Sequence, residues 1–463
     1  MDAQPMLRLF DATIRRGMPR CFGQPGRSAR RHALSTILIG LSLVALAGCS
    51  SKTYLMPTPN AYTNPGWNPF ADVPPPLQGD QVSVLYVTDR VPEKQTPDQW
   101  EYGYDRSRSA AFGEAVVQIG DGLSWDDLVQ ASRAKKRSKK LELKMTATRE
   151  VARFAKTPPV LILTDAQMAS HGAPRVDPAQ ADAERRFKED LVARLARTPR
   201  KEVFIYVHGF NNTFEDAILT TAEMWHFLGR EGVPICYTWP AGVGLLKAYE
   251  YTLASTQFTV YHFKQALRLI ASCPEVKKVH IIAHSRGTAV TTDTVRELHL
   301  EIRGTGDTQK TLKLGTVILA AADIDLDVAI ARNGTERIGR AVERSALYIS
   351  RHDEALGLSG WLFGVGRLGD LDVKMFVQAE IDALRGSQRL QLIDARVKKR
   401  GLGHSYFHAN PAVSSDLVLL LRYQLLPGAA HGRPLGVSDI GLWIVHDDYP
   451  GSTWTLPVAA RND

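Results

Sequence analysis

The sequence predicts an α/β fold with a doubly wound, mostly parallel sheet and an N-terminal β extension. Two observations favour this class. From about residue 180 onward, helical patterns alternate with short apolar runs, as in chains whose parallel strands are joined by crossover helices. The apolar run at residues 279–283 leads directly into His284-Ser285-Arg286-Gly287, which is typical of a sharp turn from a strand into a helix.

The first 48 residues predict a bacterial lipoprotein signal peptide. An apolar run at residues 33–47 follows three arginines and is too short for an ordinary membrane span. The run ends in Leu46-Ala47-Gly48-Cys49, which resembles the lipobox, in which the cysteine is lipidated and becomes the mature N-terminus. The residue after this cysteine is Ser50 rather than Asp, which resembles lipoproteins that are sorted to the outer membrane and face the periplasm. An uncleaved membrane anchor is the alternative, and Met18 is an alternative start.

The net charge of +8 does not indicate a nucleic-acid-binding protein. Seven Arg and two Asp in residues 1–48 account for +5 of it, which leaves about +3 for the rest of the chain. The basic run at residues 135–140 has no interleaved aromatic residues and is interpreted as a solvated face, with anionic headgroups or phosphates as the alternative.

Cys21 leaves with the signal peptide, and we expect Cys236 and Cys273 to be small buried thiols without a disulfide.

Four regions are expected along the chain: a signal peptide at 1–48, a flexible tether at 49–80, a folded domain at 81–428 and a C-terminal tail at 429–463. The tether is rich in Pro, Asn and Gly. The domain divides into an N-terminal β extension at 81–180 and a core at 181–428. In the extension, strands are expected at 81–90, 113–120 and 158–164. In the core, helices at 181–197, 214–228, 248–272 and 288–300 alternate with strands at 203–207, 233–239, 279–283, 316–321, 346–350 and 390–393.

Ser285 is the candidate nucleophile. A nucleophile elbow raises a serine above the end of a sheet in a strained turn, where only small residues fit two positions before and two after it. Ala283 and Gly287 meet this requirement. A simple turn is the alternative interpretation of these five residues, but the buried strand before them and the helix after them favour the elbow.

A serine hydroxyl needs a base to take its proton and a carboxylate to orient that base. In an α/β-hydrolase the acid follows the nucleophile along the chain and the histidine comes last. Asp353 lies just past the strand at 346–350, and His404 lies in a Gly-flanked loop after the last strand, so these two are preferred. Asp323 is the alternative acid, unless it caps the helix expected at 326–338, and His408 is the alternative to His404.

Acyl transfer also needs two backbone N–H groups that stabilise the oxyanion. One is expected from Arg286, directly after the nucleophile. The second is expected from the loop His208-Gly209-Phe210-Asn211 after the strand at 203–207, with Phe210 as the preferred donor. Gly209 lets this loop approach the substrate closely. His208 is interpreted as a packed residue that orients the loop.

Four motifs stand in order along the chain: Val207-His208-Gly209-Phe210-Asn211, Thr238-Trp239-Pro240, Ala283-His284-Ser285-Arg286-Gly287 and Ala321-Ala322-Asp323-Ile324-Asp325. Together they resemble a bacterial family, the α/β-hydrolases of the domain-of-unknown-function 900 type. The resemblance spans about residues 81–425 and implies a Ser-Asp-His hydrolase with Ser285 as nucleophile. Family members often have Met where Arg286 stands, and the family does not define a natural substrate.

The sequence therefore predicts an esterase-like or lipase-like serine hydrolase that forms an acyl-enzyme on Ser285 and acts on a small-molecule or lipid ester. A non-catalytic envelope lipoprotein that uses the fold as a binding scaffold and an acyltransferase with the same residues are the alternatives. The apolar stretch at residues 357–369 is either a lid for lipidic acyl chains or ordinary core.

No metal or other cofactor is expected. The histidine pairs at spacing four, His280 with His284 and His404 with His408, enclose no Glu, and the sequence has no paired Cys motif or Gly-rich phosphate loop. No nucleic-acid partner is expected, and the membrane is expected as a partner only through the lipid on Cys49.

Overall fold

The computed structural model describes residues 52–157, 178–242, 246–363, 366–371, 389–399, 401–438 and 442–457, together with residues 382 and 387. The fold lies in one compact unit formed by residues 52–243 and 247–463. The predicted signal peptide at 1–48, Cys49 and the strand expected at 158–164 lie outside the described residues.

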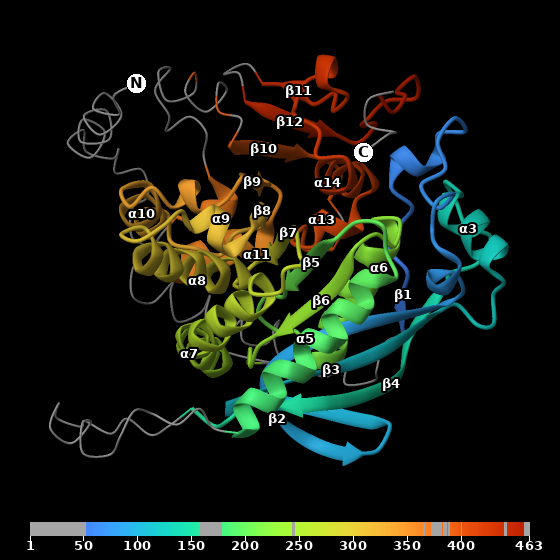
Figure 1. The fold of residues 1–463 in the computed structure, drawn as a ribbon. Helices are drawn as coiled ribbons and strands as arrows, with labels where there is room; N and C mark the ends of the chain where they lie inside the picture. The colour runs from blue at the N-terminus through green and yellow to red at the C-terminus, as the bar shows by residue number, and fades with distance from the viewer. Residues whose placement is uncertain are drawn as a thin grey trace, which may run out of the picture. The chain divides into compact units, whose positions relative to one another are not determined.

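The strands of the described residues form a single sheet in the order β1-β4-β3-β2-β6-β5-β7-β8-β9-β10-β12-β11 (Figure 1). From β2 to β12 the neighbours are parallel, whereas β1, β4, β3 and β2 pair antiparallel at one edge and β11 pairs antiparallel with β12 at the other. The predicted α/β fold with a mostly parallel sheet is confirmed. The strands are β1 (Thr53–Tyr54), β2 (Gln81–Thr96), β3 (Gln99–Ile119), β4 (Glu142–Arg153), β5 (Glu202–Val207), β6 (Val233–Thr238), β7 (Lys278–His284), β8 (Leu314–Ala320), β9 (Arg344–Ile349), β10 (Leu390–Arg396), β11 (Gly436–Val437) and β12 (Trp443–His446).

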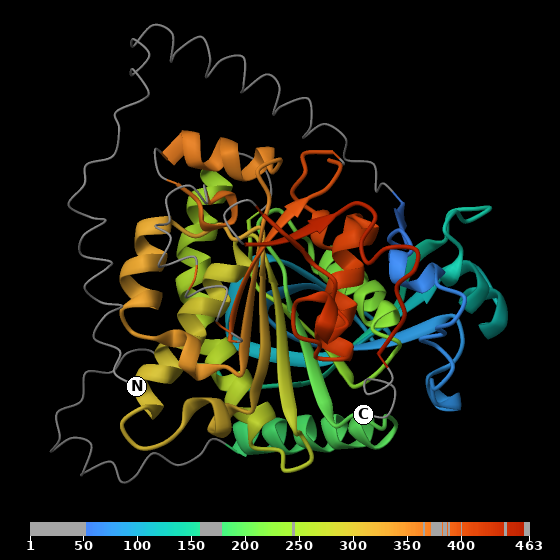
Figure 2. The same ribbon diagram turned by 90° about the horizontal axis from the view of Figure 1, so that it is seen from above.

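Helices cover both faces of this sheet (Figures 1 and 2). Successive residues of β5 point to opposite faces, so that Phe204 and Tyr206 pack with α6 and α14, while Val203 and Ile205 pack with α5, α7 and α8. The helices are α3 (Trp125–Arg133), α5 (Pro178–Ala196), α6 (Phe214–Phe227), α7 (Leu246–Ala271), α8 (Gly287–Ile302), α9 (Thr308–Leu312), α10 (Leu326–Val328), α11 (Glu354–Phe363), α13 (Tyr406–Ala409) and α14 (Pro411–Arg422).

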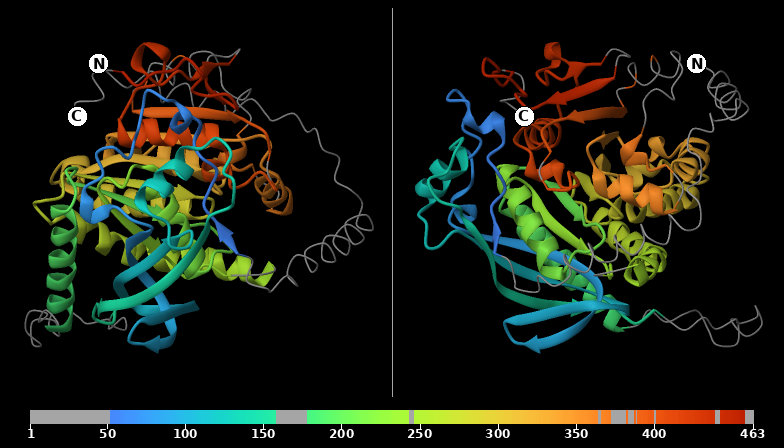
Figure 3. Two further views of the ribbon diagram at one scale, coloured as in Figure 1. Left: turned by 90° about the vertical axis from the view of Figure 1, so that its right-hand side faces the viewer. Right: turned by 180° about the vertical axis from the view of Figure 1, so that it is seen from behind.

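Residues 52–80 are not the flexible tether that their composition predicts. Tyr62 and Phe70 are almost fully buried and pack edge to face with ring centroids 5.5 Å apart. The indole of Trp67 donates to the hydroxyl of Tyr423 at 2.9 Å. The segment lies beside α3 and the chain that follows it (Figures 1 and 3). The segment has no periodic apolar pattern, so its sequence does not indicate packing. It is nevertheless held in place because its few aromatic side chains are each buried against the core.

The segment 429–463 is likewise not a free tail over its described part. Its strand β12 extends the sheet parallel to β10, with Ile393 opposite Trp443. On the face of the sheet that α14 covers, the guanidinium of Arg433 donates to both carboxylate oxygens of Asp416 on α14 at 2.7 Å, and both side chains are fully buried. The pairing fixes this segment to the core.

Other departures from the predictions are local. Residues 142–153, which follow the basic run, form β4, and the helix expected at 326–338 is divided into α10, a π-helical turn at Ala329–Gly334 and a 3-10 turn at Ile338–Ala341. The cap of α10 is Asp325, whose side chain accepts from Val328 N, and not Asp323. The thiols of Cys236 and Cys273 are free and buried, as predicted.

Candidate active site

Ser285 occupies the turn between β7 and α8. Its φ of 51° lies in the left-handed region, which is a strained conformation for a residue with a side chain. The turn is fixed to the neighbouring strand because Ser285 N donates to Ala320 O at 3.0 Å and Asp323 N donates to Ser285 O at 3.3 Å. Ala283 is fully buried within β7. The chain therefore makes the strained strand-to-helix turn that the elbow sequence predicts.

Two glycines allow other segments to approach this turn. A Cβ on Gly209 would lie 2.6 Å from Cβ of Ser285, so the loop after β5 passes directly over the serine. A Cβ on Gly287 would lie 2.3 Å from the carbonyl oxygen of His208, so the start of α8 packs against the same loop. Side chains at either position would collide with neighbouring atoms, which explains glycine at both.

His404 and Asp353 lie next to each other in the structure, although 51 residues separate them. Nδ1 of His404 is 2.7 Å from Oδ2 and 3.0 Å from Oδ1 of Asp353. The Asp353 carboxylate is fully buried, whereas the imidazole of His404 is 21% exposed. The loops that carry them also touch, because Glu354 N donates to Leu402 O at 3.0 Å. A carboxylate that accepts from Nδ1–H leaves Nε2 of the imidazole unprotonated and able to take a proton.

His284 connects this pair to the serine. The Nε2–H of His284, which precedes Ser285, donates to the backbone oxygen of His404 at 3.1 Å, and the two imidazole rings lie 4.7 Å apart. Within the described part of the chain, neither the Ser285 hydroxyl nor Nε2 of His404 makes a hydrogen bond, so the predicted serine–histidine bond is not formed here. Such bonds often tighten only when substrate binds.

The two alternative residues have other partners. The carboxylate of Asp323 accepts from the hydroxyl of Tyr249 at 2.9 Å and lies 3.3 Å from Nε of Arg367. Nδ1 of His408 is 2.7 Å from Glu223, a buried carboxylate on α6. The carboxylate of Asp323 is therefore engaged away from His404, and His408 is hydrogen-bonded to a separate carboxylate.

The loop after β5 is held by buried polar contacts. His208 is fully buried, stacks on the indole of Trp239 and accepts at Nε2 from Trp239 N at 3.0 Å, while its Nδ1–H donates to Gly209 O at 2.8 Å. Burial, with a smaller contribution from nearby Arg90, lowers the pKa of His208 to about 3. The imidazole is therefore neutral at pH 7 and serves to hold this loop, as the sequence predicts.

The candidate oxyanion donors lie in the two turns that meet at Ser285. No acceptor bonds the backbone N–H of Phe210 or of Arg286 among the described residues, so both are free to bind another group. The side chain of Arg286 points elsewhere, since its Nη1 donates to Asp323 O at 2.9 Å. Asn211 has a φ of 58°, and its N–H donates to Gly242 O at 3.3 Å, which fixes the turn that carries Phe210.

Arg90 supports this loop from the N-terminal extension and was missed in the sequence. It is fully buried in β2, two residues beyond the part that pairs with β6, where Nη2 contacts Nε2 of His208 at 3.3 Å and donates to Asn212 O at 3.0 Å. Its Nε donates to the hydroxyl of Thr238 at 3.0 Å. In the sequence, Arg90 stands out only as a charged residue at the end of the strand expected at 81–90. That position does not reveal a partner 118 residues away.

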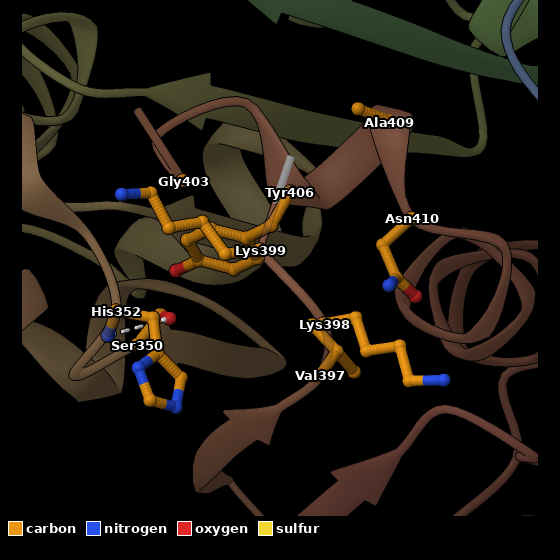
Figure 4. Close-up of a pocket in the computed structure, with 9 residues that line it drawn as sticks. All are labelled: Ser350, His352, Val397, Lys398, Lys399, Gly403, Tyr406, Ala409 and Asn410. Carbon is orange, nitrogen blue, oxygen red and sulfur yellow. Dashed lines mark hydrogen bonds between the residues drawn. The ribbon is translucent and has the colours of Figure 1, made fainter. Parts of the chain in front are cut away.

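A hollow adjoins the Asp353 and His404 loops on the side of β10 and β12. It has a volume of about 450 Å³, and Ser285 does not line it. Arg351 and Arg396 on its wall carry positive charge, whereas Asp394 and Asp447 carry negative charge. A smaller hollow beside it, shown in Figure 4, is lined by Ser350, His352, Val397, Lys398, Lys399, Gly403, Tyr406, Ala409 and Asn410.

Fold and site geometry together define an α/β-hydrolase: a mostly parallel sheet with a strained serine turn after β7 and a hydrogen-bonded Asp–His pair on the loops after β9 and β10. Comparison with known families agrees. Residues 183–422, more than half of the chain, match the model of a family described as alpha/beta hydrolase of unknown function (DUF900), and the protein belongs to this family. The match begins after β4, so the N-terminal extension lies outside it. No curated protein matches the chain.

No group of three or more His, Cys, Asp or Glu side chains that could hold a metal ion occurs among the described residues. None of the described helices is long and apolar enough to cross a membrane.

Proposed function

We propose that this protein hydrolyses carboxylic esters through an acyl-enzyme on Ser285. In this mechanism Nε2 of His404 takes the proton from the serine hydroxyl as the hydroxyl attacks the ester carbonyl, and later gives it to the leaving alcohol. Asp353 orients the imidazole and stabilises its charged form. The N–H groups of Phe210 and Arg286 stabilise the oxyanion.

The hydrogen bond between His404 and Asp353 is the observation that carries this proposal. A buried carboxylate is costly unless it has a partner, and this one is paired with a partly exposed histidine on a loop beside the serine turn. The strained φ of Ser285 gives independent support, because such strain persists mostly where function requires it.

A fluorophosphonate probe tests the proposal, since it reacts covalently with serines that are activated by a histidine. We expect the wild-type protein to be labelled and Ser285→Ala to remain unlabelled, with both proteins folded by circular dichroism. Ser359, whose hydroxyl donates to the carboxylate of Asp323 at 3.3 Å, lies near the same turn. Ser359→Ala is the matched control and should retain labelling. A folded wild-type protein that is not labelled would favour the alternative, a binding scaffold with a hydrolase fold.

The same residues would also support transfer of the acyl group to an acceptor other than water. Product analysis with added alcohols or amines separates the two reactions.

We further propose that a lipid on Cys49 anchors the protein in the bacterial outer membrane, facing the periplasm, because residues 33–49 have the order of a lipoprotein signal. Mass spectrometry of the mature N-terminus tests this.

A further inference from the structure

We propose that exposed lysines near the start of the described chain form a docking surface for anionic lipid headgroups. This lysine surface lies on the loop between α3 and β4 and on the residue that precedes β1. It does not depend on what Ser285 does. Its members are Lys52, Lys135, Lys136, Lys139 and Lys140.

The loop that carries the surface has a fixed shape because its single arginine points inward. Arg137 Nη1 donates to the backbone oxygens of Leu55 at 3.0 Å and Met56 at 2.8 Å, and Nη2 donates to the hydroxyl of Thr58 at 3.2 Å. Leu55 N in turn donates to Leu141 O at 2.8 Å at the other end of the loop. The basic run is therefore joined to residues 55–58 by several hydrogen bonds, and α3 and the segment before β2 lie side by side (Figures 1 and 3).

The lysines, in contrast, face solvent. Lys135, Lys136, Lys139 and Lys140 are all exposed, and the side chain of Lys52 is 63% exposed. In the part of the chain that the structure describes, one ion pair involves these lysines, between Lys52 and Glu142 at 2.7 Å. Nζ of Lys140 lies 5.0 Å from the centre of the Tyr54 ring, which is itself 39% exposed. The surface thus combines an excess of positive charge with an amphipathic aromatic ring, a combination that suits the headgroup region of a bilayer.

The place of this surface in the chain favours a membrane over other anionic partners. Cys49, the proposed site of lipidation, precedes Lys52 by three residues, which span at most about 10 Å. A lipid there would bring the lysines to the bilayer surface. Single-stranded nucleic acid suits this surface less well, because single strands require several aromatic stacking platforms. Among the described residues, the one aromatic ring in contact with these lysines is Tyr54, under Lys140.

Vesicle flotation tests the proposal without the lipid anchor. A chain that begins at Ser50 keeps every described residue and the whole sheet, so it retains the compact unit. We expect it to float with vesicles of 30% phosphatidylglycerol in phosphatidylcholine at low salt, and not with phosphatidylcholine alone or in 0.5 M NaCl. Each lysine near an anionic surface strengthens binding roughly fivefold, so changing residues 135, 136, 139 and 140 to Gln should weaken binding more than tenfold.

A charge-matched control separates this surface from net charge. It changes four exposed lysines in other segments to Gln and should bind the anionic vesicles within about twofold of the unmodified chain. These lysines are Lys156, Lys277, Lys310 and Lys398. The proposal is overturned if the chain from Ser50 does not float with the anionic vesicles, or if both quadruple variants lose binding equally.

Discussion

The imidazole of His284 donates a hydrogen bond to the backbone oxygen of His404, so the residue before the candidate nucleophile holds the loop of the candidate base. Burial, followed by the proximity of His404, keeps the pKa of His284 well below its usual value. His284 is therefore neutral and bonds through one fixed tautomer. The contact links the elbow to a loop 120 residues away and makes His284 a positioning residue in the proposed mechanism.

Replacing His284 should slow the reaction without unfolding the protein. In His284→Phe the ring is retained but the donor is lost, and we expect the rate of fluorophosphonate labelling to fall about 10-fold to 100-fold, as for a small misplacement of a reacting group. His284→Gln keeps a donor near the position of Nε2 and should recover most of the rate. The pH at which labelling reaches half its maximum should move in the Phe variant only. Equal rates in all three proteins would exclude a positioning role.

Replacing Asp353 should slow fluorophosphonate labelling far more than replacing Asp323. Asp353→Asn removes the carboxylate next to His404, and we expect the labelling rate to fall by about 10⁴-fold, as expected when the imidazole loses its orienting acid. Asp323→Asn affects contacts to Tyr249, Ser359 and Arg367, and we expect it to change the rate by less than tenfold. Side-by-side labelling kinetics provide the comparison. The reverse order of effects would assign the acid to Asp323.

The buried ion pair between Arg433 and Asp416 should contribute strongly to stability. Asp416→Asn leaves the guanidinium buried without its charge partner, and we expect a loss of about 3 to 5 kcal/mol in the free energy of unfolding. Replacing both residues with apolar ones, as in Arg433→Met with Asp416→Leu, should cost much less than the sum of the single changes. Urea unfolding measures all three. Strict additivity of the single changes would show that the pair does not act as a unit.

The protein should lose stability in mild acid. Burial lowers the pKa of His208 to about 3 and holds the pKa of His226 and of His284 well below 6.5. Each of these histidines stays neutral in the folded protein but is protonated below about pH 6.5 when the protein unfolds. The folded state is therefore fully stable above pH 6.5 and loses stability as the pH falls towards the pKa of the folded state. These three histidines take up three protons on unfolding, and together they should lower the free energy of unfolding by about 4 kcal/mol per pH unit near pH 5. Urea unfolding at pH 7, 6 and 5 measures this slope, and a flat profile would contradict it.

The strands of the core, and the places of the candidate site residues after those strands, could be predicted because both depend on local patterns. Ser285, Asp353 and His404 each follow an apolar run, and the carboxyl ends of parallel strands meet at one edge of a sheet. The pairing of Asp353 with His404, rather than of Asp323 with His404, required the structure, since both acids end a strand.

Contacts over long sequence separations could not be predicted in this way. The bond of Arg90 to the loop after β5 depends on the register of β2 against β6, which no local pattern specifies. The two ends of the domain were misjudged for a different reason. Their apolar residues are sparse and irregular, so composition indicates flexibility, whereas side chains such as Tyr62 and Trp454 are buried one at a time against the core.

The burial of residues 52–80 changes how far a lipid-anchored domain could travel. A flexible tether of about 30 residues would let it search a zone roughly 30 Å deep from its anchor point. Because Lys52 follows Cys49 by only three positions, the zone shrinks to about 10 Å, so the domain would move with the bilayer and meet what that surface presents. Esters that diffuse freely would have to come to the membrane, whereas esters that belong to the membrane would already be within range.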